Sequence, residues 1–308
     1  MSYDFAELLR NWSWQPVAVI GLLLVAGLYG RGWLRMRRAL PGFASGRRLG
    51  FFVLAIFLLI LAAFSPLYAL SDRFLLARSF QKVLVAMLAA PLLWQACPFH
   101  VMAWGLPGAM RRRLTRLVLR PSGAQRVLRL LTQPMVALLV FISAFLLWHD
   151  PEIANWTLGH EWAHRATLWL LLGAALLFWW HVVDTGPRLH RLRSSWLIAA
   201  SLILVEIPNM ASGVTIAFTD HPIYAHYAAM QAGSAASARL DVMTDQMVSG
   251  ALIWVMGSLV YMGSLVIVVR RLFVREGSDE PDFSFGHDIA DRAMAPGLED
   301  RNALHPWE

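Results

Sequence analysis

Long apolar runs alternate with short polar and basic connections along most of the chain. A helix that crosses the hydrocarbon core of a bilayer needs about 20 mostly apolar residues. Seven segments meet this requirement, and the connections between them are rich in Pro, Gly and charge, which is typical of turns and loops. The predicted spans are Pro16–Trp33, Leu49–Leu70, Phe74–Gln95, Pro134–Trp148, Trp162–Val183, Trp196–Phe218 and Met247–Val269.

This pattern predicts an all-α, polytopic membrane protein built as a bundle of seven transmembrane helices. Residues 1–15 would form a short outward N-terminal segment, and residues 16–270 the transmembrane domain. Residues 271–308 are polar and acidic with little periodicity, so we expect a disordered cytoplasmic tail.

The composition supports a lipid-embedded chain. Of the 308 residues, 57% are hydrophobic and only 15% are charged, whereas soluble domains average about 45–50% and about 25%. These values exclude an ordinary soluble enzyme and a disordered chain. A single Cys excludes an intramolecular disulfide and a Cys-rich zinc module.

The basic residues predict the orientation. Nineteen of the 27 Lys and Arg residues lie in the connections after the first, third, fifth and seventh spans or in the residues next to them. Cytoplasmic loops carry the excess of basic residues, so the N-terminus would lie outside and the C-terminus in the cytoplasm. The net charge of +7 therefore indicates topology, and a nucleic-acid partner is not expected. The clusters comprise Arg31, Arg35, Arg37, Arg38, Arg47, Arg48, Arg111, Arg112, Arg113, Arg116, Arg120, Arg126, Arg129, Arg188, Arg191, Arg193, Arg270, Arg271 and Arg275.

Five of the ten His residues fall on the predicted outward side, where several carboxylates also lie. Imidazoles and carboxylates at one surface can bind a metal ion or relay protons. Asp245 would either cap the last span or join the histidines, with Gln246 as a hydrogen-bonding neighbour. The predicted metal ligands are His149, His160, His164, His226 and Asp245.

Residues 160–164 read H-E-x-x-H, the zinc-protease pattern in which two His bind the metal and the Glu is the general base. If the fifth span starts near Gly159, His160 and His164 would share one helix face. A membrane zinc metalloprotease that uses His160, Glu161 and His164 is therefore one alternative function. No third ligand is evident nearby, although a catalytic zinc site needs one.

Two ionisable residues lie at predicted lipid depth, namely Glu206 and Lys82, the only lysine. Such residues are costly in hydrocarbon and are candidates for function. A proton or ion transporter that uses both is a second alternative. A haem carrier would need His pairs at hydrocarbon depth, and a retinal-type photoreceptor would need a lysine in the last span. The sequence favours neither.

Five stretches, in this order, resemble the CtaG-type cytochrome c oxidase assembly factors, which are bacterial integral membrane proteins. The resemblance covers about Leu70 to Val269. It rests on Ala89–Leu93 with Pro98, on Trp148-His149-Asp150-Pro151 with His160 and His164, on Leu177–His181, on Ile223–Tyr227, and on Asp245-Gln246-Met247 with Gly250, Ile253 and Trp254.

The resemblance implies help with copper delivery or insertion during assembly of a haem–copper oxidase, without enzymatic turnover. It implies a bacterial inner membrane with the His-rich face in the periplasm, and oxidase subunits or other assembly factors as partners besides the lipid bilayer.

The chain departs from the family at the start of the third span. The family usually carries His-Met-x-x-His there, whereas residues 78–82 read Arg-Ser-Phe-Gln-Lys, with Gln81 kept. Guanidinium and ammonium groups are poor metal ligands. Two alternatives follow: copper binds through His149, His160 and His164 alone, or the chain has diverged to another task.

Overall fold

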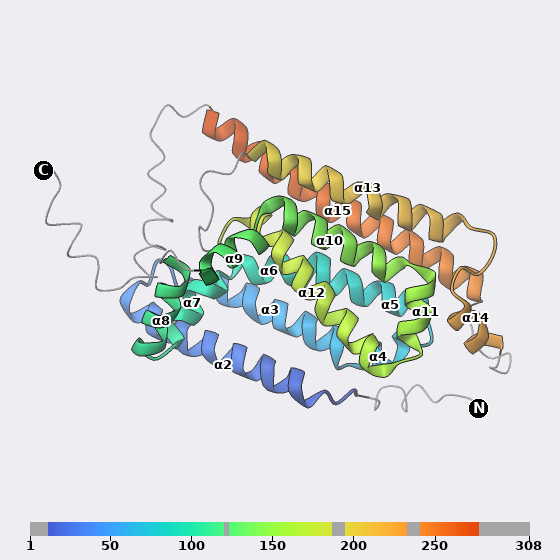
Figure 1. Ribbon diagram of the computed structural model, residues 1–308, viewed down its shortest axis with the longest axis horizontal. Coiled ribbons are helices and arrows are strands. Elements are labelled where there is room, and N and C mark those ends of the chain that lie inside the picture. Colours follow the sequence, from blue (N-terminus) through green and yellow to red (C-terminus); the bar gives the residue numbers. More distant parts are fainter. Residues whose placement is uncertain (1–11, 120–122, 187–194, 233–240, 277–308) are drawn as a thin grey trace, which may run out of the picture.

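The described part of the chain is built from helices. The computed structural model describes residues 12–119, 123–186, 195–232 and 241–276, and it contains no strand within them. The predicted all-α class is confirmed. Figure 1 shows long helices packed side by side, with short helices at both ends of the bundle.

Six helical segments are long and apolar enough to cross a membrane. The remaining predicted span, α10 (Pro134–His149), has 16 residues, which is about 24 Å of helix. It bends by 71° into α11 (Pro151–Leu158), and the bent pair makes the seventh candidate. The six segments are α2 (Pro16–Ala39), α3 (Gly46–Ala63), Leu75–Gln95, α12 (Glu161–Val183), α13 (Ser195–Phe218) and α15 (Val242–Glu276).

Three predicted helix ends were wrong. The first helix, α2, runs to Ala39 instead of ending at Trp33. The second span ends at Ala63 instead of Leu70 because Ser65 starts a new helix, α4 (Pro66–Ser71), by accepting a hydrogen bond from Leu67 N. Pro66 suits this first position because it has no N–H to satisfy. The last helix runs on to Glu276, so the first six residues of the predicted tail are helical; residues 277–308 lie outside the described residues.

The connections were predicted as loops, but several contain short helices. One connection holds α7 (Pro98–Gly105), α8 (Gly108–Leu119) and α9 (Gly123–Leu131), and another holds α14 (Ala225–Ala232). Figure 1 places α7 and α8 at one end of the bundle and α4, α11 and α14 at the other. We call these the basic end and the histidine end.

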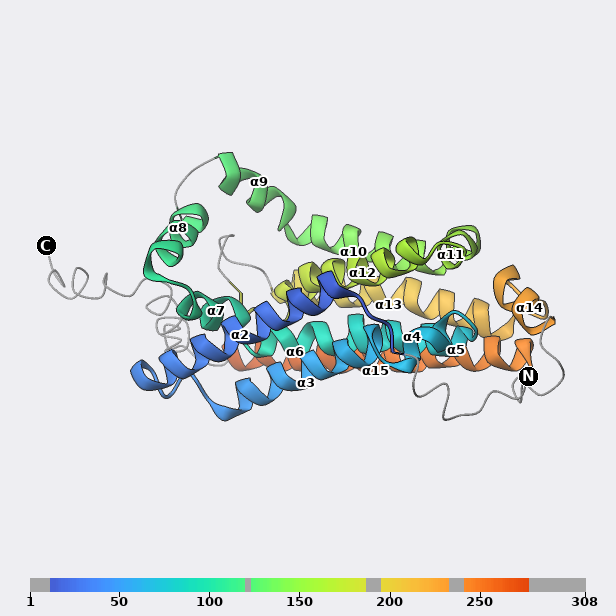
Figure 2. The ribbon, with the colours of Figure 1, turned by 90° about the horizontal axis from the view of Figure 1, so that it is seen from below.

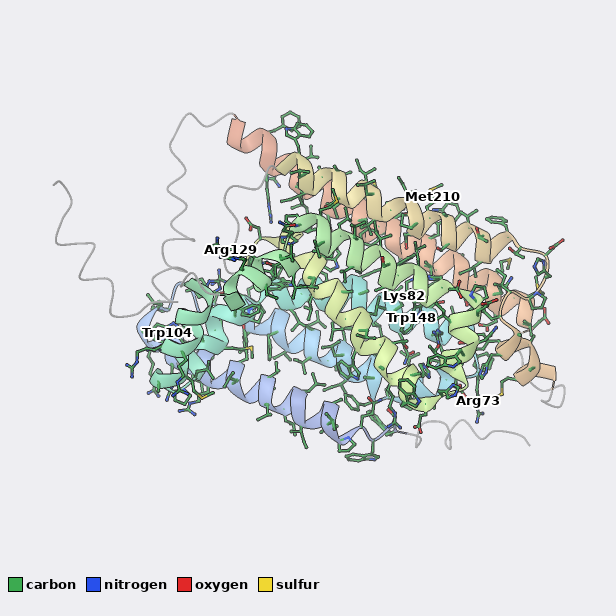
Figure 3. All side chains as sticks on the ribbon, in the orientation of Figure 1. Arg73, Lys82, Trp104, Arg129, Trp148 and Met210 are labelled. Carbon is green, nitrogen blue, oxygen red and sulfur yellow. The ribbon has the colours of Figure 1, made fainter. Side chains whose placement is uncertain are left out.

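The basic clusters and the histidine-rich segments separate along the bundle. Figure 3 shows Trp104 and Arg129 toward the basic end and Arg73 at the histidine end. Four of the predicted basic residues, Arg120, Arg188, Arg191 and Arg193, lie outside the described residues. Which end faces the cytoplasm stays a prediction.

The innermost span is Leu75–Gln95, in which the most apolar stretch of 18 residues is 78% buried within the bundle. It consists of α5 (Leu75–Lys82), a π-helical segment η1 (Val83–Ala89) and α6 (Ala90–Gln95). It packs against α3, α12 and α15 (Figure 2). This central position brings the polar side chains of α5 into the protein interior.

Helices α13 and α15 pack with almost no gap between their backbones. A Cβ atom added at Gly250 would lie 2.5 Å from Gly213 O and 2.4 Å from Ala217 N. Small residues let membrane helices approach closely, where van der Waals contacts hold them together. The approach therefore requires glycine at position 250.

We expect Gly250→Val to push α15 away from α13 and to destabilise the protein by about 1–3 kcal/mol, the usual cost of overpacking. Thermal unfolding of the purified protein in detergent measures the change. Gly263→Val is the matched control, because a Cβ at Gly263, on the same helix, meets no atom within 4 Å. Equal melting temperatures for the two variants would contradict this account.

Candidate functional site

His164 lies buried at the histidine end, near the start of α12. Its Nε2 lies 3.3 Å from Ser71 Oγ, and the Ser71 hydroxyl donates its proton to Tyr68 O at 2.7 Å. Since that proton is committed, the imidazole Nε2–H must be the donor to Ser71. The Tyr68 ring stacks on the imidazole at 4.8 Å between centroids. This tautomer leaves the lone pair of His164 Nδ1 for another partner.

His226, at the start of α14, contacts the residue after Ser71. Its Nε2–H donates to Asp72 O at 2.9 Å, and Asp72 Oδ1 lies 3.4 Å from the same nitrogen. The side chain is 20% exposed, and its Nδ1 also keeps a lone pair. Two imidazoles, one from α12 and one from α14, therefore bond to the consecutive residues Ser71 and Asp72.

Two tyrosines fix this arrangement from the side of α14. Tyr227 donates to Ser71 O and Tyr224 donates to His149 O, both at 2.9 Å. Burial raises the pKa of Tyr224 to about 12 and also raises the pKa of Tyr227. Both hydroxyls therefore stay protonated donors over the physiological pH range.

His149, at the end of α10, has no free lone pair. Its Nδ1–H donates to Phe145 O at 2.8 Å, and its Nε2 accepts a hydrogen bond from Lys82 Nζ. Lys82 is fully buried, and Figure 3 marks its place among the helices of the bundle. A metal at His149 would have to displace the lysine.

The H-E-x-x-H residues do not converge. Helix α12 starts at Glu161, so His160 precedes it in an extended conformation (φ −134°, ψ 106°) and does not share a helical face with His164. His160 is exposed and donates from Nδ1 to Trp156 O at 2.9 Å. Glu161 pairs with Arg165. The expected pair of ligands one turn apart is therefore not formed.

Asp245 caps a helix other than its own. Its two carboxylate oxygens accept from Leu75 N at 2.8 Å and Leu76 N at 3.0 Å, at the start of α5. Phe74, at the N-cap position, provides no side-chain hydrogen bond. A carboxylate at a helix N-terminus is also favoured by the helix dipole. The predicted metal ligand is thus a buried cap, with 1% of its surface exposed.

The two predicted supporting glutamines hold backbone segments. Gln246 accepts from Ile223 N at 2.8 Å and donates to His221 O at 3.1 Å, which fixes the connection before α14. Gln81 donates to Ala62 O at 2.7 Å, which ties α5 to α3. None of these three hydrogen bonds involves an imidazole ring.

Asp220 and His221 form an exposed pair beside this connection. His221 Nδ1 lies 3.0 Å from Asp220 Oδ1, and this hydrogen bond lowers the pKa of the Asp220 carboxyl. The pair does not contact the buried imidazoles through any side-chain hydrogen bond of the described residues.

The intramembrane residues of the transporter hypothesis have separate partners. Glu206 accepts from Asn209 Nδ2 at 3.3 Å and from the Ser258 hydroxyl, between α13 and α15. Lys82 binds His149 on α10. Glu206 therefore joins two helices, away from the hydrogen bonds of Lys82.

The predicted ligands are thus gathered at one end of the bundle but not at one point. Among the described residues, no three His, Cys, Asp or Glu side chains group as a metal site. Copper binding stays a prediction. Sequence reasoning missed Asp72 and Ser71, for which the only signal was their place directly before the third span.

The family described as cytochrome c oxidase caa3 assembly factor (Caa3_CtaG) matches residues 27–275. The chain belongs to this family. The resemblance found in the sequence is confirmed, and membership in a caa3 assembly factor family suggests a non-catalytic role in which the protein interacts with oxidase components. No curated protein and no solved structure matches the chain.

For this assembly factor we expect Asp245→Asn to lower stability by about 1–3 kcal/mol, because an amide turns one N–H donor toward the donors of α5 and removes the charge. Thermal unfolding in detergent measures the loss. Asp241→Asn, an exposed acid four residues earlier, is the control and should unfold as the wild type does. An Asp245→Asn variant of unchanged stability would contradict the capping role.

Proposed function

We propose that this protein assists the assembly of a caa3-type cytochrome c oxidase by handing over copper at its histidine end, through His164 and His226. One observation carries the proposal. In a member of this family, two imidazoles that each have a free Nδ1 bond to the consecutive residues Ser71 and Asp72.

The chemistry of the pair suits transfer. Imidazole is a good ligand for copper, and the Asp72 carboxylate beside His226 adds an oxygen donor of opposite charge. A site with few protein ligands leaves positions open for ligands of a donor or an acceptor protein. The partial exposure of His226 gives such a protein access, while His164 anchors the site inside the bundle.

The proposed location is a bacterial inner membrane with the histidine end in the periplasm. The argument is the positive-inside rule, since the arginine-rich connections lie at the other end of the bundle. The proposed role consists of binding and release, so it needs no catalytic residue.

We expect the double variant His164→Asn/His226→Asn to lower the copper content and the activity of the assembled oxidase several-fold in cells that depend on this protein. Asparagine keeps a side-chain donor for Ser71 and Asp72 but removes the imidazole lone pairs. Metal analysis of the purified oxidase and its oxidase activity measure the effect.

His221→Asn is the matched control, because this exposed His lies at the same end and bonds only Asp220 through its side chain. Immunoblots of membranes verify that all variants accumulate equally. Full copper loading of the oxidase by the double variant would refute a role of the two imidazoles in transfer.

A further inference from the structure

Two basic side chains lie buried one helical turn apart on α5. Arg78 is 2% exposed and Lys82 is fully buried. A guanidinium keeps its charge in proteins, and a buried charge is costly unless a partner of opposite charge or a set of hydrogen bonds compensates it. The partners of Arg78 therefore need to be identified.

Those partners leave one edge of the guanidinium unsatisfied. Nη2 donates to Thr157 Oγ1 at 3.4 Å, and the guanidinium carbon lies 4.6 Å from the centre of the Trp148 ring. Nη1 is buried and has no acceptor. Since arginine has five N–H donors, a large part of its hydrogen-bonding capacity is unused.

No carboxylate of the described residues forms an ion pair with Arg78 or Lys82. The buried acid on α15, Asp245, directs both oxygens at the backbone N–H groups that start α5. Lys82 donates to His149 and lies 3.9 Å from the centre of the Phe145 ring, so its contacts also lack an anion.

A small cavity adjoins the unsatisfied side chain. Arg78, Ser79, Trp148, His149 and Tyr224 contribute to its lining. The centre of a water-sized particle has about 10 Å³ of space there, which is room for one such particle. The cavity therefore has room for a single small particle, such as a monatomic ion or a water molecule.

We infer that this cavity binds one small monovalent anion of halide size, which accepts a hydrogen bond from Arg78 Nη1. A water molecule could accept the same bond, but it would leave the guanidinium charge without a counter-charge in a medium of low dielectric constant, where Coulomb attraction is strong. The anion would link α5 to α10 and α11, which provide Trp148 and Thr157. The lining of the cavity includes neither His164 nor His226, the imidazoles of the proposed copper transfer.

The test compares thermal unfolding of the purified full chain in detergent with chloride and with gluconate, at equal ionic strength. Gluconate is too large for the cavity. At a chloride concentration about tenfold above the dissociation constant, we expect a melting temperature about 3 °C higher than in gluconate. Bromide should act as chloride does.

Arg78→Gln should abolish the difference in melting temperature between chloride and gluconate. Arg73→Gln is the control, because Arg73 lies at the same end but outside the cavity lining, and this variant should keep the difference. Equal melting temperatures of the wild type in both salts would mean that water fills the cavity and would overturn the inference. A chloride effect that persists in Arg78→Gln would place the anion elsewhere.

If Arg78→Gln fails to fold, ³⁵Cl line widths of the wild-type protein decide the matter. Binding predicts broadening that added bromide reverses, and no broadening would overturn the inference. Neither measurement uses oxidase assembly, so this result is independent of the copper proposal.

Discussion

The carboxylate of Asp245 on the amino end of α5 is the interaction on which the arrangement of the histidine end depends. A helix end in a dry interior must find acceptors for its free N–H groups, because no water can supply them. Phe74 cannot do so, and α15 provides the acceptor from about 170 residues away in the sequence. The start of the innermost helix is thereby fixed against α15, and Arg78 and Lys82 follow within the bundle.

The sequence was sufficient to predict the class of fold, because apolar segments of about 20 residues have few alternatives to membrane-spanning helices. It failed where short-range chemistry competes with hydropathy. Ser65 and Pro66 end one helix and begin the next within an apolar run, and α10 is shorter than the others because it bends at Asp150–Pro151. Of the helices inside the arginine-rich connection, α8 and α9 carry too many arginines, and α7 has too few residues, to be recognised from apolar length alone.

Sorting the histidines by topology predicted a group of residues that the structure also places at one end of the bundle, but hydropathy says nothing about which nitrogen is free. That depends on which carbonyl each ring reaches. His149 and His160 bond the carbonyls of Phe145 and Trp156, four residues earlier in the chain, whereas His226 bonds the distant Asp72 O. Helix α12 starts at Glu161, two residues after the Gly159 on which the prediction depended, and this was enough to separate His160 from His164. Ligand spacing along a chain is therefore informative only when the helix boundary is known to the residue.

The π-helical segment η1 lies between the polar half and the apolar half of the innermost span. Its i→i+5 hydrogen bonds take up an extra residue without ending the helix. The side chains of α5 are consequently rotated, relative to an unbroken α-helix, with respect to those of α6, whose Trp94 packs on Trp180 of α12. During evolution, the residues that α5 presents to the histidine end could change their angular position by insertion or deletion within η1, while the aromatic packing of α6 stayed in place.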